Sequence, residues 1–432
     1  MRELFYLEKE WLSNYPDHWK MSRLKDHTYT NTGITFTKAD LVDEGNSVLS
    51  YGQVHAKNNP RTQINHELIK FIPDSLVEDK SSAKVKEGDY IFADTSEDLD
   101  GCGNCIYVNE DIDLYAGYHT TLLRNESLKC GKYYAYLFMS DQWRSQIRKK
   151  VKSVKLYSIS QGILNQTFIV IPPIAEQEAI AADLDKECEK IGREIELLER
   201  KADAYCRLRR SLINLAVTRG LNPNTPLKPS GLRWIPLIPE HWTIGRVRNF
   251  FNYRNEKVSE IDFAPLSVTK NGVVPQMENV AKSMAEGDTR KKVCKNDFVV
   301  NSRSDRKGSC GTAPLDGSVS YICIVLEPTN IDPHFANYYF RGNDWIEEFY
   351  RNGKGIVADL WTTNYSAMRN IEIAVPPFSE QIAIANFLDE KCGKVDAIVE
   401  KIDAKIERLK ELKRSLINEV VTGQRAINTS EL

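Results

Sequence analysis

Clusters of basic residues are the side chains of this sequence whose chemistry points most directly to a ligand. The first half of the chain carries Lys149, Lys150, Lys152, Tyr157 and Gln161. The second half carries a comparable set, which comprises Ser302, Arg303, Arg306, Lys307, Lys354 and Asn364. Lysine and arginine neutralise phosphates, whereas guanidinium, amide and hydroxyl groups can hydrogen-bond to base edges. The clusters therefore predict nucleic-acid contacts, with the lysines on phosphates and Arg303 or Arg306 on guanine.

A run of charges is more commonly just a solvated face, and that alternative applies to each cluster taken singly. A further basic segment at residues 290–295 adds to the second set, whereas residues 96–100 of the first half are acidic at a comparable place. An offset of 204 residues aligns Tyr157 with Trp361. We expect Trp361 to pack against its domain core. The recurrence of basic clusters in both halves favours binding over mere solvation.

Motifs for catalysis, nucleotide binding and metal binding are missing from the sequence. It has no glycine-rich phosphate loop and no dinucleotide fingerprint. Cys102 and Cys105 have the spacing of half a zinc site, but no second pair stands at a suitable distance. Adenine methyltransferases place Asn or Asp before Pro-Pro-aromatic, and here Val375 precedes Pro376-Pro377-Phe378. We therefore expect no catalytic residue, no metal and no cofactor in this chain.

The composition describes a chain with room for two or three cores. It has 432 residues, 41% of them hydrophobic, and its 58 basic and 60 acidic residues leave a net charge of -2. Near-neutrality argues against coating nucleic acid by bulk charge. No stretch is apolar for long enough to cross a membrane, so we expect a cytoplasmic protein. Nine scattered cysteines suit reduced thiols better than a disulfide framework.

The elements that must position the clusters are duplicated. Residues 172–218 align without a gap to residues 376–422, and 21 of 47 positions are identical. A second echo pairs the Pro-acid-His-Trp segments 16–19 and 239–242. The segments between these anchors share little identity and differ in length, which suggests one scaffold that carries two specificities.

Each repeated segment predicts a long helix with one apolar stripe. Pro-Pro marks each entry, and Gly220 and Gly423 mark the exits. The apolar residues recur every three or four positions, as in a coiled coil. The first stripe is Ile180, Leu184, Cys188, Ile191, Ile195, Leu198, Ala202, Tyr205, Leu208 and Leu212, and the second is Ile384, Leu388, Cys392, Val395, Val399, Ile402, Ile406, Leu409, Leu412 and Leu416. The seam should be formed by Leu184, Ile191, Ile195, Leu198, Leu388, Val395, Ile402 and Leu409.

The predicted fold class is α+β, with two mixed α/β domains in tandem, each followed by a long helix. We expect the two helices to pair as an antiparallel coiled coil with pseudo-two-fold symmetry, unless they serve only as a dimerisation zipper. The predicted boundaries are 1–171 for the first domain, 172–220 for its helix, 221–237 for an extended linker, 238–375 for the second domain, 376–424 for its helix and 425–432 for a tail.

Over nearly its whole length the sequence resembles the specificity (S) subunits of type I restriction-modification systems. The resemblance is carried by Pro-acid-His-Trp, by Pro-Pro-x-x-Glu-Gln at residues 172–177 and 376–381, and by Arg-Ser-Leu-Ile-Asn at 210–214 and 414–418. It implies two target-recognition domains that each read half of a bipartite asymmetric site in double-stranded DNA, and helices that set the unread spacer. It also implies docking of two methyltransferase (M) subunits and two restriction (R) subunits for adenine-N6 methylation or ATP-dependent cleavage. S-adenosylmethionine, Mg²⁺ and ATP would belong to those partners.

Two other functions fit the same pattern. The chain could be a coiled-coil adaptor whose variable domains bind proteins, or a solitary regulator that binds DNA without a methyltransferase. A stable complex with methyltransferase chains would distinguish the specificity subunit from both.

Overall fold

The computed structural model describes residues 15–152, 155–276, 289–355 and 361–426 and divides into two compact units. Unit 1 comprises Met1–Leu198 and Ala404–Leu432, and unit 2 comprises Glu199–Asp403. The long helices α6 (Ile174–Arg219) and α10 (Phe378–Val421) each contribute one part to either unit. The predicted helices are therefore confirmed, but they are shared between the units rather than standing as segments of their own. Most of the predicted tail, residues 427–432, lies outside the described residues.

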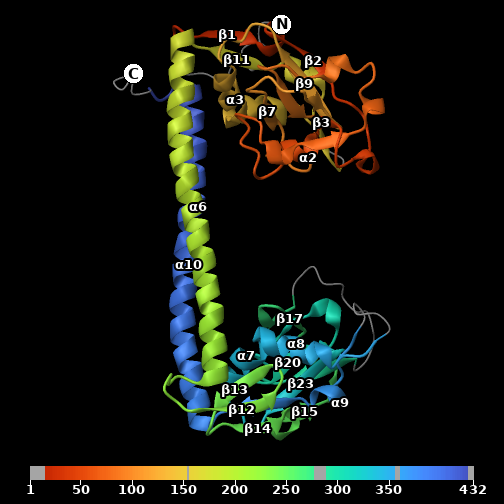
Figure 1. The fold of residues 1–432 in the computed structure, drawn as a ribbon, viewed down its shortest axis with the longest axis vertical. Helices are drawn as coiled ribbons and strands as arrows, with labels where there is room; N and C mark the ends of the chain where they lie inside the picture. The colour runs from red at the N-terminus through yellow and green to blue at the C-terminus, as the bar shows by residue number, and fades with distance from the viewer. Residues whose placement is uncertain (1–14, 153–154, 277–288, 356–360, 427–432) are drawn as a thin grey trace. The chain divides into compact units, whose positions relative to one another are not determined.

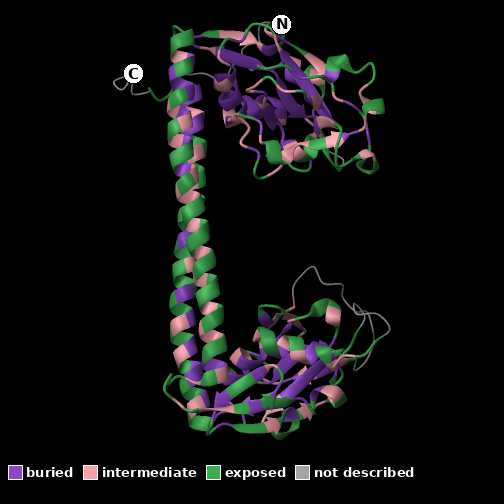
Figure 2. Ribbon diagram, in the orientation of Figure 1, coloured by how far each residue is buried: buried purple, intermediate pink, exposed green. Residues whose placement is uncertain are grey.

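Unit 1 is built on the four-stranded antiparallel sheet β2-β9-β5-β7. Its strands are β1 (Lys20–Arg23), β2 (Thr28–Thr32), β3 (Asn46–Leu49), β4 (Lys70–Ile72), β5 (Tyr90–Ala93), β6 (Thr95–Ser96), β7 (Cys105–Tyr107), β8 (Tyr115–Ala116), β9 (Thr120–Asn125), β10 (Tyr157–Ser158) and β11 (Phe168–Ile171). Its shorter helices are α2 (Tyr51–Val54), α3 (Gly131–Met139), α4 (Asp141–Arg148) and α5 (Gln161–Asn165). The aromatic residues of α3 and α4 pack on the central sheet, and this layer forms a buried core (Figure 2).

Unit 2 repeats this sheet as β15-β23-β20-β21, again antiparallel throughout. Its strands are β12 (Leu227–Leu232), β13 (Ile235–Pro239), β14 (Thr243–Arg246), β15 (Phe251–Arg254), β16 (Lys257–Val258), β17 (Leu266–Thr269), β18 (Gly272–Pro275), β19 (Arg290–Val293), β20 (Phe298–Asn301), β21 (Cys310–Thr312), β22 (Gly317–Ser320), β23 (Cys323–Pro328) and β24 (Glu372–Val375). Its shorter helices are α7 (Pro333–Phe340), α8 (Asn343–Arg351) and α9 (Tyr365–Met368). The predicted mixed α/β class is confirmed for both domains.

The segment that we expected to be an extended linker differs from the prediction. Residues from Leu227 onward form the antiparallel hairpin β12–β13. Leu232, Ile235 and Ile238 of this hairpin are buried in the core of unit 2. Burial of these apolar side chains stabilises the hairpin, so the chain between α6 and β14 is part of the second domain rather than a tether.

Within each unit the two long helices lie side by side and run antiparallel (Figure 1). An ion pair joins them in each unit, Glu194 to Lys405 at 2.7 Å in unit 1 and Arg209 to Asp396 at 2.9 Å in unit 2. The seam residues are buried or half-buried, and these are Leu184, Ile191, Ile195, Leu198, Leu388, Val395, Ile402 and Leu409. Two equivalent members of the predicted stripes, Leu208 and Leu412, are instead 47% and 51% exposed. The 3.6-residue turn drifts away from a strict 3.5-residue repeat, which moves these positions off the seam.

A glutamate in the first turn of each long helix joins that helix to the Pro-acid-His-Trp segment of its own domain. Glu176 accepts from Trp19 Nε1 at 2.8 Å and lies 2.7 Å from His18 Nε2. Glu380 makes the same two contacts with Trp242 and His241, at 3.3 and 2.7 Å. The strand that follows each tryptophan pairs with the strand that enters the helix, β1 with β11 and β14 with β24. The repeated histidines are therefore part of these two junctions.

The C-terminal end of each long helix lies against the junction at the start of the other long helix. Gly220 and Gly423 end α6 and α10 with φ of +74° and +72°, which is the left-handed conformation typical of helix ends. A Cβ on Gly423 would lie 2.3 Å from Pro16 Cδ, and one on Gly220 would lie 2.7 Å from Glu380 Oε1. Glycine is needed at both helix exits because of backbone conformation and because of this close approach.

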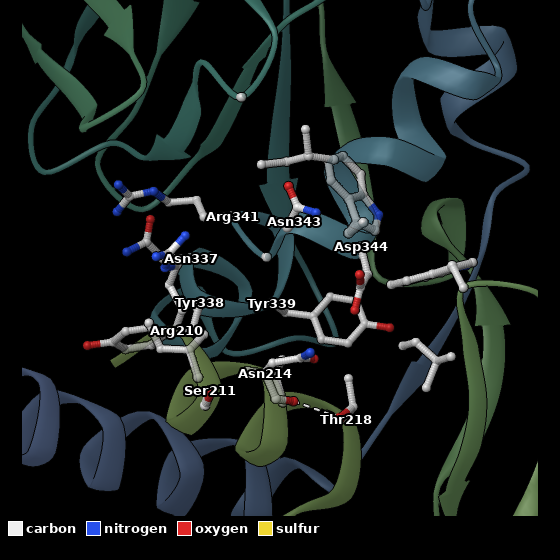
Figure 3. Close-up of a pocket in the computed structure, with 18 of the residues that line it drawn as sticks. Arg210, Ser211, Asn214, Thr218, Asn337, Tyr338, Tyr339, Arg341, Asn343 and Asp344 are labelled. Carbon is white, nitrogen blue, oxygen red and sulfur yellow. Dashed lines mark hydrogen bonds between the residues drawn. The ribbon is translucent and has the colours of Figure 1, made fainter. Parts of the chain in front are cut away.

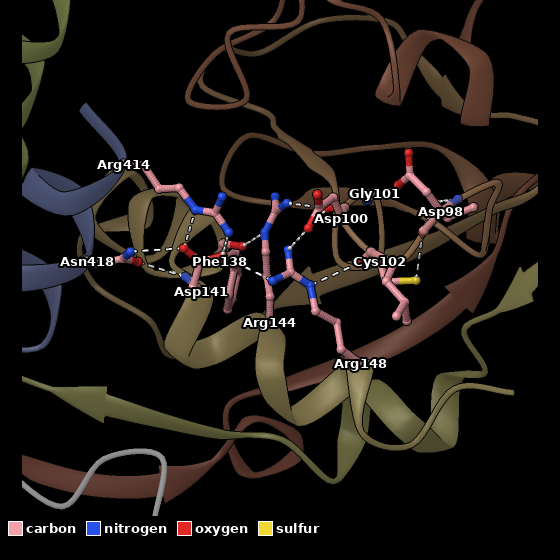
Figure 4. Close-up of polar contacts among 12 residues, drawn as sticks. Asp98, Asp100, Gly101, Cys102, Phe138, Asp141, Arg144, Arg148, Arg414 and Asn418 are labelled. Carbon is pink, nitrogen blue, oxygen red and sulfur yellow. Dashed lines mark hydrogen bonds and ion pairs between the residues drawn. The ribbon is translucent and has the colours of Figure 1, made fainter. Parts of the chain in front are cut away.

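A second repeated contact attaches the body of each helix to its domain. Tyr136 of α3 donates to Asp185 at 2.8 Å, and Tyr338 of α7 donates to Asp389 at 2.7 Å. Unit 1 has a third attachment at the N-terminus of α4, where Arg414 Nη2 donates to Asp141 at 2.7 Å. The Asn418 amide donates to the same carboxylate at 3.0 Å and its oxygen accepts from the Asp141 backbone N–H at 2.7 Å (Figure 4).

Truncation of a buried leucine of the predicted apolar stripe should destabilise the protein far more than truncation of an exposed leucine one turn away. Leu416 is 6% exposed and Leu412 is 51% exposed on the same helix. We expect Leu416→Ala to lower the free energy of unfolding by about 2–5 kcal/mol, because it leaves a cavity. Leu412→Ala should change it by no more than about 0.5 kcal/mol. Denaturant unfolding of both variants checks this, and equal losses would contradict the burial of Leu416.

Removal of the Asp141 charge should give a pH-dependent loss of stability. Hydrogen bonds from Arg414, Asn418 and Arg148 hold the pKa of Asp141 well below its usual range. A carboxyl with a lowered pKa stabilises the folded state above its unfolded pKa of about 4, and this stabilisation disappears as the pH falls toward the lowered value. We expect Asp141→Asn to cost about 1–3 kcal/mol at pH 7 and progressively less below about pH 4.

Thermal melts of wild type and variant across this pH range provide the measurement. Asp113→Asn is the matched control, because Asp113 pairs with Lys84 at 2.8 Å but its side chain is 72% exposed. That variant should stay within about 0.5 kcal/mol of wild type. A loss for Asp141→Asn that is the same at every pH would show that the ion pair does not stabilise the domain on α10.

Candidate nucleic-acid interface

The second candidate surface lies at the end of strand β20 and gathers three segments of unit 2. The Ser304 N–H donates to the Trp361 carbonyl at 2.9 Å, and Thr363 N–H donates to the Ser302 carbonyl at 2.9 Å. Lys354 and Thr362 exchange both backbone hydrogen bonds, at 3.2 and 3.0 Å. Residues 302–307, 354 and 361–364, which are far apart in sequence, are therefore adjacent in the fold.

The arginines of this surface are exposed and only lightly held. The side chains of Arg303 and Arg306 are 48% and 69% exposed, and both face Asp305 at 3.1 and 3.9 Å. Lys307 pairs with Glu347 at 2.7 Å. Exposed ion pairs contribute about 0–1 kcal/mol, so these cations can exchange a carboxylate for a phosphate or a base edge at small cost.

Two residues of the second half lie differently from our expectations. Ser302 is 4% exposed and so has a structural position, whereas Asn364 is exposed and also caps α9 by accepting from Ala367 N–H at 3.0 Å. Trp361, which we expected in the core, is 36% exposed. It lies next to the arginines because its carbonyl is bonded within their loop, and it presents an aromatic face that sequence reasoning missed.

The basic segment 290–295 is directed largely inward. Lys291 is 4% exposed and donates to the Tyr253 hydroxyl at 3.0 Å and to the Cys323 carbonyl at 2.8 Å. Lys292 pairs with Glu256 at 3.1 Å, and the Arg290 guanidinium donates to Ser318. Alternating residues of β19 point into the domain, which removes Lys291 from the binding surface, whereas Lys295 is exposed and a contribution of this segment to binding stays a prediction.

The first candidate surface is more dispersed. Lys149 and Lys152 are exposed after α4, and Lys150 donates to Gln166 at 3.2 Å. Tyr157 is half-buried in β10, which pairs with β6. Gln161 is engaged within the domain, because its oxygen accepts from Thr30 at 3.1 Å and its nitrogen donates to Thr32 at 3.0 Å. Lys149 and Lys152 therefore retain the accessibility that a phosphate contact needs.

A cluster of exposed aromatic residues at the end of β5 was not found from the sequence. Tyr51 and Tyr118 are 39% and 36% exposed, and their ring centroids lie 6.3 Å apart. His119 lies 5.6 Å from Tyr51 and 3.0 Å from an Asp94 oxygen. The backbone of His119 is left-handed, with φ of +54°. No signal in the sequence joins residues almost 70 positions apart.

The arginine surface of unit 2 and the aromatic cluster of unit 1 occupy equivalent places on two sheets that have the same strand order. β5 and β20 are corresponding strands, and the segments that follow them are bonded to residues 157–159 and 361–363, respectively. The chemistry at this place differs, with aromatic and acidic residues in unit 1 and arginines in unit 2. In unit 1 the acidic loop is held through its backbone, since Arg148 Nε donates to the Leu99 carbonyl at 3.0 Å and Arg144 Nη1 to the Asp100 carbonyl at 3.1 Å (Figure 4).

The described residues hold no cluster of three or more side chains arranged to ligate a metal. Cys102 and Cys105 are both buried, and burial raises the pKa of the Cys105 thiol to about 12. Over the same parts of the chain, none of the helices combines the length and the apolarity of a membrane span.

Several known proteins are similar to this chain over most of its length. Residues 16–200 match the family model described as the type I restriction modification DNA specificity domain. The chain is 20% identical to the type I restriction enzyme StySPI specificity subunit of Salmonella potsdam over 95% of this chain and 89% of that protein. It is 23% identical to the putative MjaX specificity subunit of Methanocaldococcus jannaschii over 98% of this chain and 99% of that protein.

The fold agrees with these sequence matches. A solved chain from work on complex assembly and conformational transition of the type I R-M system superposes with a TM-score of 0.70 at 15% identity, covering 95% of this chain and 100% of that one. The superposition covers most of both units and of both long helices. Residues 16–200 thus match the DNA specificity domain of type I restriction-modification systems, and 95–98% of the chain is similar to specificity subunits of that family.

Proposed function

We propose that this chain recognises a bipartite asymmetric site in double-stranded DNA, with each domain reading one half. The observation that carries the proposal is the repetition of one sheet in two units with different side chains at the same place. Arg303, Arg306 and Trp361 offer guanidinium groups and an aromatic face in unit 2. Tyr51, Tyr118 and His119 offer aromatic groups in unit 1. Two unlike surfaces on one repeated scaffold suit two unlike half-sites.

The proposed contacts differ in kind. Lys149, Lys152 and Lys354 are exposed cations without a planar fork, so they bind phosphates as point charges. Arg303 and Arg306 can pair bidentately with guanine O6 and N7 in the major groove. Ser302 and Asn364 hold their loops in place, and Gln161 does the same in the first domain.

The long helices set the spacer between the half-sites in this proposal, and the repeated junctions dock two methyltransferase subunits. The junctions suit that role because they present the same motifs in both units. Two restriction subunits would join for ATP-dependent cleavage. S-adenosylmethionine, Mg²⁺ and ATP would be held by those partners, and this chain would select the adenine for N6 methylation without catalysing the transfer.

A protein-binding adaptor is the alternative from another class. The exposed leucines Leu208 and Leu412 would serve such an adaptor as well as they would serve a docked methyltransferase. Nucleic acid is nevertheless favoured as the ligand of the domains. Exposed arginines lie beside an exposed tryptophan at the end of β20, and the residues at the end of the corresponding strand β5 are different.

Substitution of Arg303 should alter recognition of one half-site. We expect Arg303→Ala, tested in complex with the methyltransferase subunits, to cost about 1–3 kcal/mol of binding free energy and to relax the preference at one half of the methylated motif. Arg246→Ala is the control, since Arg246 is 46% exposed and weakly paired with Glu372, but lies on β14 away from this surface. Filter binding and methylome sequencing provide the measurements. Unchanged affinity and an unchanged motif for Arg303→Ala would remove it from the interface.

Co-expression with the methyltransferase chains of the same host should yield a stable complex. We expect two methyltransferase chains per copy of this chain and adenine methylation at a single bipartite motif. Size-exclusion chromatography with light scattering gives the stoichiometry, and methylome sequencing with and without this gene gives the motif. DNA binding with no methyltransferase in complex would indicate a solitary regulator, and neither activity would favour the adaptor.

A further inference from the structure

A cavity of about 500 Å³ in unit 2 lies between α6 and the helices α7 and α8 (Figure 3). Its apolar wall includes Trp234, Tyr339 and Trp345. Four basic side chains and one acidic side chain also line it, and these are Arg209, Arg210, Lys270, Arg341 and Asp344. The size and the apolar wall are those of a small-molecule site, and the excess of cations favours an anion.

The chain itself shows what ligand this place accepts, because unit 1 contains the equivalent residues. Arg210 and Asn214 of α6 correspond in the repeat to Arg414 and Asn418 of α10. In unit 1 those two side chains hold the carboxylate of Asp141, the first residue of α4. That carboxylate accepts from both a guanidinium and an amide.

Unit 2 has the same two donors, but in the part of the chain that the structure describes no carboxylate is bonded to them, although Asp344 also lines the cavity. The first residue of α8 is Asn343, which corresponds to Asp141 because Trp345 and Trp143 are the fully buried third residues of their helices. Across the ranges that the structure describes, the Arg210 side chain makes one hydrogen bond, from Nε to the Cys206 carbonyl of its own helix at 3.4 Å. The side chain of Asn214 makes none there, and the cavity occupies the space between these residues and Asn343 (Figure 3).

The two units differ only in this attachment of a short helix to a long helix, among the repeated contacts described above. The repeated glutamates and the repeated aspartates of the long helices keep the same domain partners in both units. Trp345 also contributes a buried Nε1 without a partner among the described residues. Trp143 shares that unpaired nitrogen but does not line the corresponding cavity of unit 1.

We propose that the cavity of unit 2 binds a small carboxylate with an apolar body, whose carboxylate pairs with Arg210 and Asn214 as Asp141 pairs with Arg414 and Asn418. The apolar part lies against Trp234, Tyr339 and Trp345. A bound ligand attaches the start of α8 to α6, as Asp141 attaches α4 to α10. This inference concerns the chain alone and does not rest on its proposed DNA recognition.

Phenylacetate and its neutral counterpart phenylacetamide are the probes, titrated calorimetrically into the full chain without DNA. We expect saturable binding of phenylacetate and at least tenfold weaker binding of phenylacetamide. Asn343→Asp places a carboxylate of the chain in the site, so it should raise the melting temperature and weaken phenylacetate binding at least tenfold. Aspartate is favourable in the first turn of a helix, so this variant should fold.

Arg210→Gln should also weaken phenylacetate binding at least tenfold, whereas Arg207→Gln, on the same helix but outside the cavity lining, should leave it unchanged. Hydrogen exchange at the first turn of α8 should slow when phenylacetate is added. Equal binding of acid and amide, or equal binding by wild type and Arg210→Gln, would overturn the proposal. Binding of a polyglutamate peptide without binding of phenylacetate would assign the site to a protein partner and overturn the small-molecule assignment.

Discussion

Glu176 and Glu380 each accept a hydrogen bond from a tryptophan, which lies 157 residues earlier for Glu176 and 138 residues earlier for Glu380. Closure of so long a segment costs conformational entropy, and this contact works together with the pairing of the first and last strands to offset it. Once the two ends of a domain are joined at the start of a long helix, the domain and that helix have a fixed relation. The central sheet, the loops at its end and the candidate surfaces all depend on this closure.

The long helices add a second constraint. An amphipathic helix of 46 or 44 residues would expose its apolar stripe if it stood alone. Each unit covers half of each stripe with the antiparallel partner and with the core of its domain, so leucines such as Leu184 and Leu388 are fully buried. The same helices therefore belong to both cores. Glycine exits at residues 220 and 423 let the end of one helix contact the junction at the start of the other.

The repeat also explains why some residues recur and others diverge. Three identical polar residues of the two helices, Glu176, Asp185 and Gln177, make the same bonds as their counterparts in unit 2, to their own domain or to the helix entry. The segments that follow β5 and β20 do not make these repeated bonds to the long helices. Their side chains can differ, which is the physical condition for two separate specificities on one framework.

The sequence by itself determined the duplication, the long helices with their entries and exits, the mixed α/β class and the resemblance to specificity subunits. These features are local or periodic, so proline pairs, apolar spacing and repeated motifs are sufficient to find them. Identical order of the two central sheets was not predictable, because strands with little shared identity can still pair in the same order. The accessible site residues were also beyond the sequence. Burial of Ser302 and Lys291, exposure of Trp361, and the meeting of Tyr51 with His119 depend on contacts between distant segments. The difference between Arg414, which bonds to Asp141, and Arg210, which faces a cavity, was decided by the tertiary structure alone. Pairing of a guanidinium with a carboxylate depends on their distance in space and not on their spacing along the chain.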